Sequence, residues 1–347
     1  MDNRNRWNHR HVNCMKMKNV SNILSILFGA MIVFASCHRE DIPCNETENA
    51  EYPIVFSTMT ADLDVKAESE EQTIAQIKTD GFHVWGSRTN GDQTDNNVFL
   101  STGSDVTFNP TSSSWIYSPV RYWSAGDYTF YAVSPKNLVT TGGFGAAGVF
   151  NLNFGTGWDL STTKTDLMLG KAIASGATKL AEANGPTPVT LTFEHMLSMI
   201  NFTAKNTEGR ESTITITGVE ISGNHYVAES WTMSGSARRW DFTDATAIWS
   251  VGLQNDVTLA TDQFSAITSD VVVFPEDNFN LTVKVSYNIT IDGATGSDTK
   301  SATIAPTWES GKIYTYQINL TSDHITFSDP KVQDWADGGS ADDEIEF

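Results

Sequence analysis

The stretch NLTVKVSYNITI, residues 280–291, alternates between apolar and polar side chains along its whole length. A period of two places successive side chains on opposite faces of a strand. One face of this segment is therefore apolar and the other polar, which predicts a half-buried strand of an antiparallel sheet. The apolar face carries Leu281, Val283, Val285, Tyr287, Ile289 and Ile291.

The same alternation recurs in STITITGVEI (212–221), INFTAKN (200–206) and IYTYQINL (313–320), with Gly, Asn, Asp and Ser clustered between the runs. Helical character is confined to EQTIAQI (71–77) and TFEHMLSM (192–199). We therefore expect a mainly β protein built from antiparallel β-sandwiches.

The length of 347 residues exceeds that of one ordinary sandwich, so two tandem domains are expected. A stretch rich in Ala, Gly and Pro at 174–190 is the candidate boundary. It predicts an N-terminal sandwich over 52–185 and a C-terminal sandwich over 186–335, followed by an acidic tail over 336–347.

The N-terminus has the features of a targeting segment. Lys16 and Lys18 precede the mostly apolar run 22–34, which is too short to span a bilayer and suits a signal peptide. We expect residues 1–36 to be that signal, with translation starting at Met1, Met15 or Met17.

The signal ends in Phe34-Ala35-Ser36-Cys37, which resembles a bacterial lipobox. This pattern predicts cleavage between Ser36 and Cys37 and attachment of lipid to the Cys37 sulfur, which would hold the chain on the outer membrane. The alternative is a buried or stray cysteine. Residues 37–51 contain few apolar groups and should form a tether.

The composition gives little support to enzymes or to nucleic-acid binding. A net charge of −20 would be repelled by phosphate backbones. No serine lies in a G-x-S-x-G turn, and Cys37 and Cys44 both fall in the tether. His195 has no second ligand at metal spacing, so a packed or capping histidine is favoured. We expect no catalytic residues, no metal and no cofactor.

The segment WIYSPVRYWSAGDYTFYAVSP, residues 115–135, is dense in aromatic side chains. It could form a platform for stacking sugars, or it could be sandwich core and edge. The second interpretation is favoured because a period of two already directs Tyr128, Phe130 and Ala132 inward.

Five segments together carry a resemblance to the fimbrillin family, the subunits of type V pili of Bacteroidia, including the Mfa-like group. They are the aromatic segment 115–135, TDLMLGKA (165–172), LTFEHMLSMINFTAKN (191–206), GKIYTYQINL (311–320) and ITFSDPKVQDW (325–335). The lipobox agrees with this resemblance, because such pilins are made as lipoproteins.

The resemblance implies two transthyretin-like sandwiches and a first strand that a surface Arg/Lys-specific protease removes. A strand from the next pilin subunit then fills the groove. The candidate first strand lies within 51–65, and Lys66-Ala67 directly after it is the proposed cleavage site. Arg39 and Arg88 are weaker alternatives. The apolar positions of the strand are Tyr52, Ile54, Phe56, Leu63 and Val65.

The resemblance leaves the place of the subunit in the fibre open. The tail after Trp335 has only Ile345 and Phe347 as apolar groups, and HITFSDPKVQDW (324–335) is a better strand for donation to a neighbour. Both a shaft subunit and a tip or accessory subunit fit, with a host or bacterial surface molecule as ligand. The alternative function is a surface glycan-binding lipoprotein of a polysaccharide-uptake system.

Overall fold

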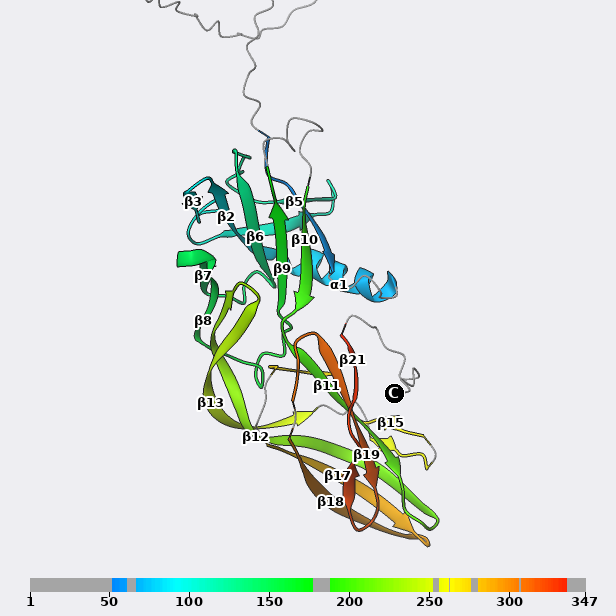
Figure 1. The fold of residues 1–347 in the computed structure, drawn as a ribbon. Coiled ribbons are helices and arrows are strands. Elements are labelled where there is room, and N and C mark those ends of the chain that lie inside the picture. The colour runs from blue at the N-terminus through cyan, green and yellow to red at the C-terminus, as the bar shows by residue number, and fades with distance from the viewer. Residues whose placement is uncertain are drawn as a thin grey trace, which may run out of the picture. The chain divides into compact units, whose positions relative to one another are not determined.

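The computed structural model describes residues 52–60, 67–176, 188–251, 256–261, 263–275, 280–305 and 307–335. In these ranges the chain forms three β-sheets, together with one α-helix and a short 3-10 turn, η1 (Ala146–Gly148) (Figure 1). The prediction of a mainly β protein is therefore confirmed.

The first sheet is built from the N-terminal half of the chain and includes β10. Its strands follow the order β1-β10-β9-β6-β2-β4-β5, and β3 pairs with β2. The bounds are β1 (Phe56–Thr60), β2 (Phe82–Asn90), β3 (Gln93–Asp95), β4 (Ser104–Asn109), β5 (Ser114–Ile116), β6 (Asp127–Ser134), β9 (Met168–Ala174) and β10 (Val189–His195).

The second sheet has the order β18-β17-β12-β8-β7, with β13 and β14 paired to β12. Its long strand β12 pairs with β17 near its start and with β8 near its end. The bounds are β7 (Thr141–Phe144), β8 (Phe150–Asp159), β12 (Ser212–Ser234), β13 (Ala237–Val251), β14 (Val257–Thr258), β17 (Leu281–Ile291) and β18 (Ala294–Ile304).

The third sheet has the order β15-β11-β19-β20, with β16 paired to β11 and β21 paired to β19. Most pairings in the three sheets are antiparallel, but β1 runs parallel to β10 and β11 runs parallel to β19. The bounds are β11 (Ser198–Asn206), β15 (Ser265–Ala266), β16 (Val271–Val273), β19 (Lys312–Leu320), β20 (Ile325–Phe327) and β21 (Lys331–Asp334).

The alternating stretch 280–291 forms β17, as predicted, and its apolar face enters a core between the second and third sheets. Leu281, Val283, Val285 and Tyr287 are at most 1% exposed. They pack with apolar residues of β11, β12 and β19, which makes this part of the molecule a β-sandwich.

Both faces of the first sheet contribute side chains to a core, as the alternation along β6 shows. Tyr128, Phe130 and Ala132 face one core, as predicted, together with residues of β1, β2 and β10. Tyr131 and Val133 face a different core, shared with β8 and the end of β12. That core draws on residues from both sides of position 185, so the division of the chain into two domains there stays a prediction.

One of the two predicted helical stretches is confirmed. Residues 71–77 lie within α1 (Ala67–Asp80), and Ile77 of this helix is fully buried against the first sheet. Among the described residues, no helix has the length and apolar character needed to cross a membrane.

The other prediction of helical character, over 192–199, is wrong. This segment contains the end of β10 and the start of β11. Phe193, Met196 and Leu197 have the spacing of one helical face, but the spacing arises because the chain turns from one strand into the next at Met196 and Leu197. All three side chains are buried, in two different cores.

Candidate functional site

The segment 52–60 lies between β10 and the loop that follows β5. Its β1 part runs parallel to β10, in register from Phe56 opposite Val189 to Thr60 opposite Phe193. Its earlier part pairs with the loop after β5: the Ile54 amide donates to the Arg121 carbonyl at 2.8 Å. The Trp123 amide donates in turn to the Tyr52 carbonyl at 2.9 Å. The segment therefore joins β10 to the 121–123 loop.

The side chains of this segment fill the core beneath it. Ile54 is 0% exposed and Phe56 is 6% exposed. The Phe56 ring has four aromatic neighbours with centroids 5.7–6.0 Å away, namely Phe82, Phe99, Tyr117 and Phe130. Without the segment, these rings would line an apolar groove.

Tyr117 holds the start of the segment in place. Its hydroxyl donates to the Ile54 carbonyl at 2.7 Å. Burial raises the pKa of the Tyr117 phenol, although the hydrogen bond with the Arg121 backbone opposes the rise. The phenol thus stays protonated at neutral pH and keeps its ability to donate. Sequence reasoning placed Tyr117 in the aromatic segment but missed this role, because it depends on a contact between residues distant in the chain.

The structure describes only some of the predicted maturation residues. Tyr52 is half-buried and, with Ile54 and Phe56, belongs to the docked segment. Ala67 is the first residue of α1. The remaining positions lie outside the described residues: Ser36, Cys37, Arg39, Leu63, Val65 and Lys66.

Arg88, one alternative cleavage position, lies in the interior of β2. It stands opposite Asp95 of β3 on one side and Tyr128 of β6 on the other. A backbone paired on both sides is a poor protease substrate, because proteases cut extended and accessible segments. The geometry therefore disfavours Arg88.

His195 is a packed histidine, as its apolar surroundings predicted. Its Nδ1 lies 2.6 Å from Asp166 Oδ2, and its ring stacks on Trp335 with centroids 4.2 Å apart and planes 1° from parallel. The sequence alone did not reveal either partner. In the described part of the chain, no group of three or more His, Cys, Asp or Glu side chains is placed to hold a metal ion.

The aromatic segment 115–135 is mainly core, which confirms the favoured interpretation. Trp115, Tyr128, Phe130 and Tyr131 are buried. Tyr122, at 45% exposed, is the aromatic side chain of this segment that is most open to solvent. The segment does not present a row of stacked rings to the surface.

A family model described as fimbrillin-like matches residues 69–335, which is most of the chain. The chain belongs to the fimbrillin-like family. The resemblance drawn from the five segments is therefore confirmed. Family membership places this fimbrillin-like chain among structural, non-enzymatic proteins, with a pilin role at the cell surface in assembly with other pilin subunits.

Solved structures align with most of the chain at low identity. A candidate cell adhesion protein from Bacteroides uniformis is 16% identical, with a TM-score of 0.47, and the match covers 83% of this fimbrillin-like chain and 99% of the other. The fimbrial anchor protein Mfa2 from Porphyromonas gingivalis is 11% identical, with a TM-score of 0.35 and coverage of 82% and 97%. A comparison with curated proteins found no match.

Proposed function

We propose that this chain is a fimbrial subunit that is made as a lipoprotein and matured by cleavage after Lys66. Cleavage removes the segment 52–60, and a strand from the next subunit takes its place. The observation that carries the proposal is the docking of that segment: it joins β10 to the 121–123 loop and buries Ile54 and Phe56.

The energetics of the groove supply a drive for assembly. Burial of Ile54 and Phe56 contributes roughly 3–6 kcal/mol, at about 1.5–3 kcal/mol for each side chain. A vacated groove would expose Phe82, Phe99 and Phe130 to water. An incoming strand would bury them again and would take its register from backbone pairing with β10. Head-to-tail contacts whose rotation does not close into a ring would produce a fibre.

The proposed order of events links release to assembly. Lipid on Cys37 would hold the uncut subunit on the outer membrane, exposed at the cell surface. A cut after Lys66 separates the lipid from the folded chain in the same step that opens the groove. An Arg/Lys-specific surface protease is the partner that this step requires.

The C-terminal strands bear on the place of the subunit in the fibre. β20 and β21 pair with β19, so the segment 324–335 has a position in the subunit's own sheet. None of the residues in β20 and β21 is fully buried, and Val332 is 42% exposed. A shaft subunit would have to release these shallow strands to donate them, whereas a tip subunit would only accept a strand. Both roles fit the proposal.

The test compares two substitutions in cells that make the fimbriae. Lys66→Gln removes the proposed cleavage site, and Arg39→Gln removes the alternative basic residue in the tether. We expect Lys66→Gln to abolish denaturant-resistant ladders of the subunit and to leave the chain at its uncut mass. Arg39→Gln should form ladders like the unaltered protein. Normal ladders from Lys66→Gln, or their loss in Arg39→Gln alone, would contradict the proposal.

A further inference from the structure

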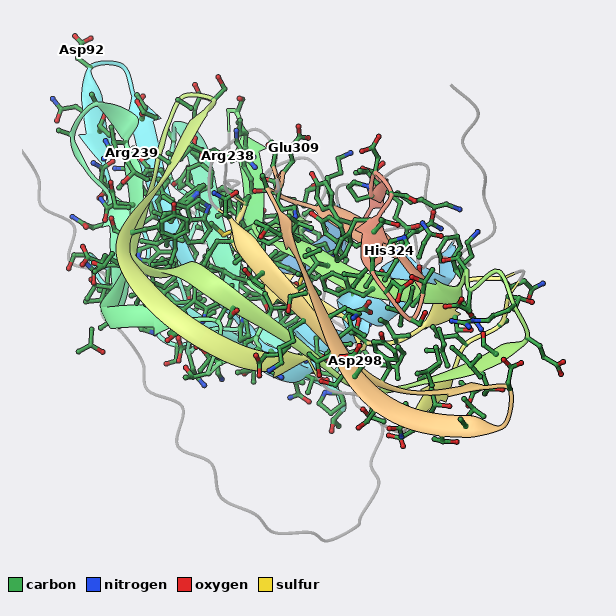
Figure 2. The ribbon with its side chains drawn as sticks, turned by 90° about the horizontal axis from the view of Figure 1, so that it is seen from below. Asp92, Arg238, Arg239, Asp298, Glu309 and His324 are labelled. Carbon is green, nitrogen blue, oxygen red and sulfur yellow. The ribbon has the colours of Figure 1, made fainter. Side chains whose placement is uncertain are left out.

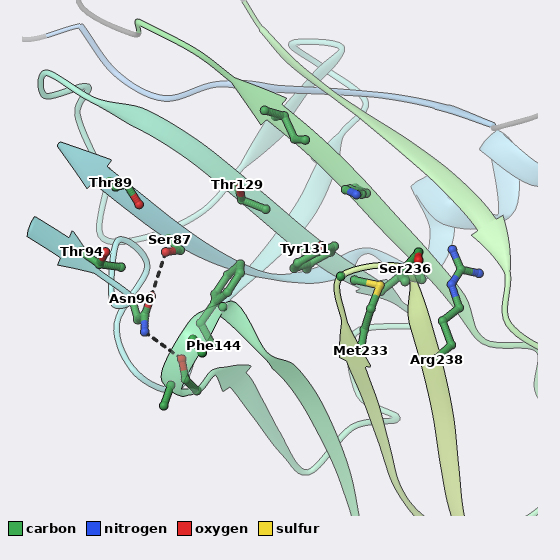
Figure 3. A pocket seen from close by; sticks show the side chains of 18 of the residues that line it. Ser87, Thr89, Thr94, Asn96, Thr129, Tyr131, Phe144, Met233, Ser236 and Arg238 are labelled. Carbon is green, nitrogen blue, oxygen red and sulfur yellow. Dashed lines mark hydrogen bonds between the residues drawn. The ribbon is translucent and has the colours of Figure 1, made fainter. Parts of the chain in front are cut away.

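An open cleft of about 840 Å³ lies on the face of the first sheet that points away from the core filled by Ile54 and Phe56. Its floor is formed by β2, β6, β9 and β10, and its walls by the β7–η1 segment and by the tip of the β12–β13 hairpin (Figure 3). Thr129 and Tyr131 enter it from β6, and Lys171 and Ile173 enter it from β9.

The walls of the cleft are held in place by specific contacts. The Ser87 hydroxyl donates to Asn96 Oδ1 at 2.8 Å, and Asn96 Nδ2 donates to the Gly145 carbonyl at 3.2 Å (Figure 3). On the other side, Arg238 forms an ion pair with Glu194 of β10. Arg238 and its neighbour Arg239 lie near the hairpin tip (Figure 2). The cleft is thus preorganised from both sides.

The cleft presents unused hydroxyl groups. Thr89, Thr94, Thr129 and Ser236 line it, and within the described part of the chain their side chains make no hydrogen bond. A hydroxyl can donate one hydrogen bond and accept two, which suits a ligand that itself carries many hydroxyls. Sugars have this character, and they also present apolar C–H faces.

Apolar side chains in the same cleft match such faces. Ile173 is 66% exposed, an unusual position for isoleucine, and Phe144, Met233 and Tyr131 line the same cleft. Burial raises the pKa of the Tyr131 phenol, against the opposing influence of Arg238, so the phenol is neutral at physiological pH. Apolar surface with a few oriented polar groups is typical of small-molecule sites.

The charges of the cleft distinguish among sugars. Glu194 neutralises Arg238, whereas Lys171 has no carboxylate partner among the described residues. Its ammonium lies 5.8 Å from the centre of the Tyr131 ring. The cleft therefore holds one unpaired positive charge in a chain whose net charge is −20. Because the Debye screening length is about 8 Å at physiological ionic strength, Lys171 attracts a carboxylate that lies close to it. The net negative charge of the chain repels a polyanion.

We propose that this cleft binds a saccharide bearing one carboxylate group, with the carboxylate at Lys171 and sugar hydroxyls at Thr129 and Thr89. The site is separate from the docked segment 52–60, so binding does not depend on strand exchange. Through this site, either a shaft subunit or a tip subunit would bind a ligand at the cell surface.

The test measures binding of three probes to the purified full chain by saturation-transfer NMR and calorimetry. Sialyllactose carries one carboxylate, lactose carries none, and heparin is a polyanion. We expect saturable binding of sialyllactose, about five- to tenfold weaker binding of lactose, and no tighter binding of heparin. Lys171→Gln should reduce sialyllactose binding to the level of lactose, and Thr129→Val should weaken both.

Two controls separate a lost site from a lost fold. Lys171→Arg keeps the charge and should keep the preference for sialyllactose. Lys164→Gln removes an exposed lysine outside the cleft and should change nothing. The proposal is overturned if neither saccharide binds saturably, if Lys171→Gln binds sialyllactose like the unaltered chain, or if heparin binds most tightly.

Discussion

Tyr316 shows how one buried side chain makes the stability of this molecule depend on pH. It lies on β19 in the C-terminal core, is 4% exposed, and stacks on Phe202 with centroids 5.4 Å apart. Burial raises the pKa of its phenol to about 12, and the hydrogen bond donated by Trp308 Nε1 at 3.0 Å opposes the rise only in part. The phenol has to be neutral for the core to pack as it does.

The sign of the effect follows from the direction of the shift. The folded pKa lies above the unfolded value of about 10, so the stabilisation is complete below pH 10 and is lost as the pH rises toward 12. The loss attributable to Tyr316 is on the order of 3 kcal/mol. We expect the free energy of unfolding, measured with urea from pH 8 to pH 11.5, to fall more steeply in the unaltered chain than in Tyr316→Phe. Parallel curves would contradict this account of the core.

At the scale of single residues, the sequence predicts correctly which way a side chain faces where the local pattern alone decides it. Tyr128, Phe130 and Ala132 were expected to face inward and do so, because strand alternation alone sets their direction. The partners of His195 could not be predicted. Asp166 and Trp335 come from distant parts of the chain, and only the tertiary arrangement brings them together.

At the scale of elements, the docked first strand gives a direct test of packing. Phe56→Ala removes a ring that contacts four other aromatic rings, and we expect it to lower the free energy of unfolding by about 3–5 kcal/mol. Its neighbour Ser57 makes an exposed contact at 2.9 Å with the Thr190 hydroxyl, so Ser57→Ala should cost less than about 1 kcal/mol.

Denaturant unfolding of both variants in the uncut full chain measures the two losses. A similarly small loss of unfolding free energy in both variants would mean that β1 contributes little to the core. Its removal would then leave no apolar groove that a second strand could stabilise. A selective loss in Phe56→Ala supports the proposed groove without depending on any protease.

Long strands with clean alternation were predictable, and short or unusually paired strands were not. β17 was expected from the alternation in 280–291, since eleven residues of one period leave little ambiguity. The parallel pairing of β1 with β10 was not foreseeable, because register across more than a hundred residues depends on contacts that the pattern does not encode. The turn at Met196 and Leu197 produced an apolar spacing that is typical of a helix.

At the scale of the whole molecule, the proposed assembly depends on three separate features of the sequence. In the proposed maturation, lipid on Cys37 would hold the subunit at the membrane and cleavage after Lys66 would release it. The groove beneath Ile54 and Phe56 would then receive a strand of the neighbouring subunit. The family model matches residues 69–335. The proposed maturation steps act on residues that precede this range in the chain.

The most direct test of the central claim is the N-terminal sequence and intact mass of the subunit in isolated surface polymers. The account predicts a chain that begins at Ala67, without lipid and without the segment 52–60. Polymers in which every subunit begins at acylated Cys37 would contradict it, because the first strand would then still occupy its own groove.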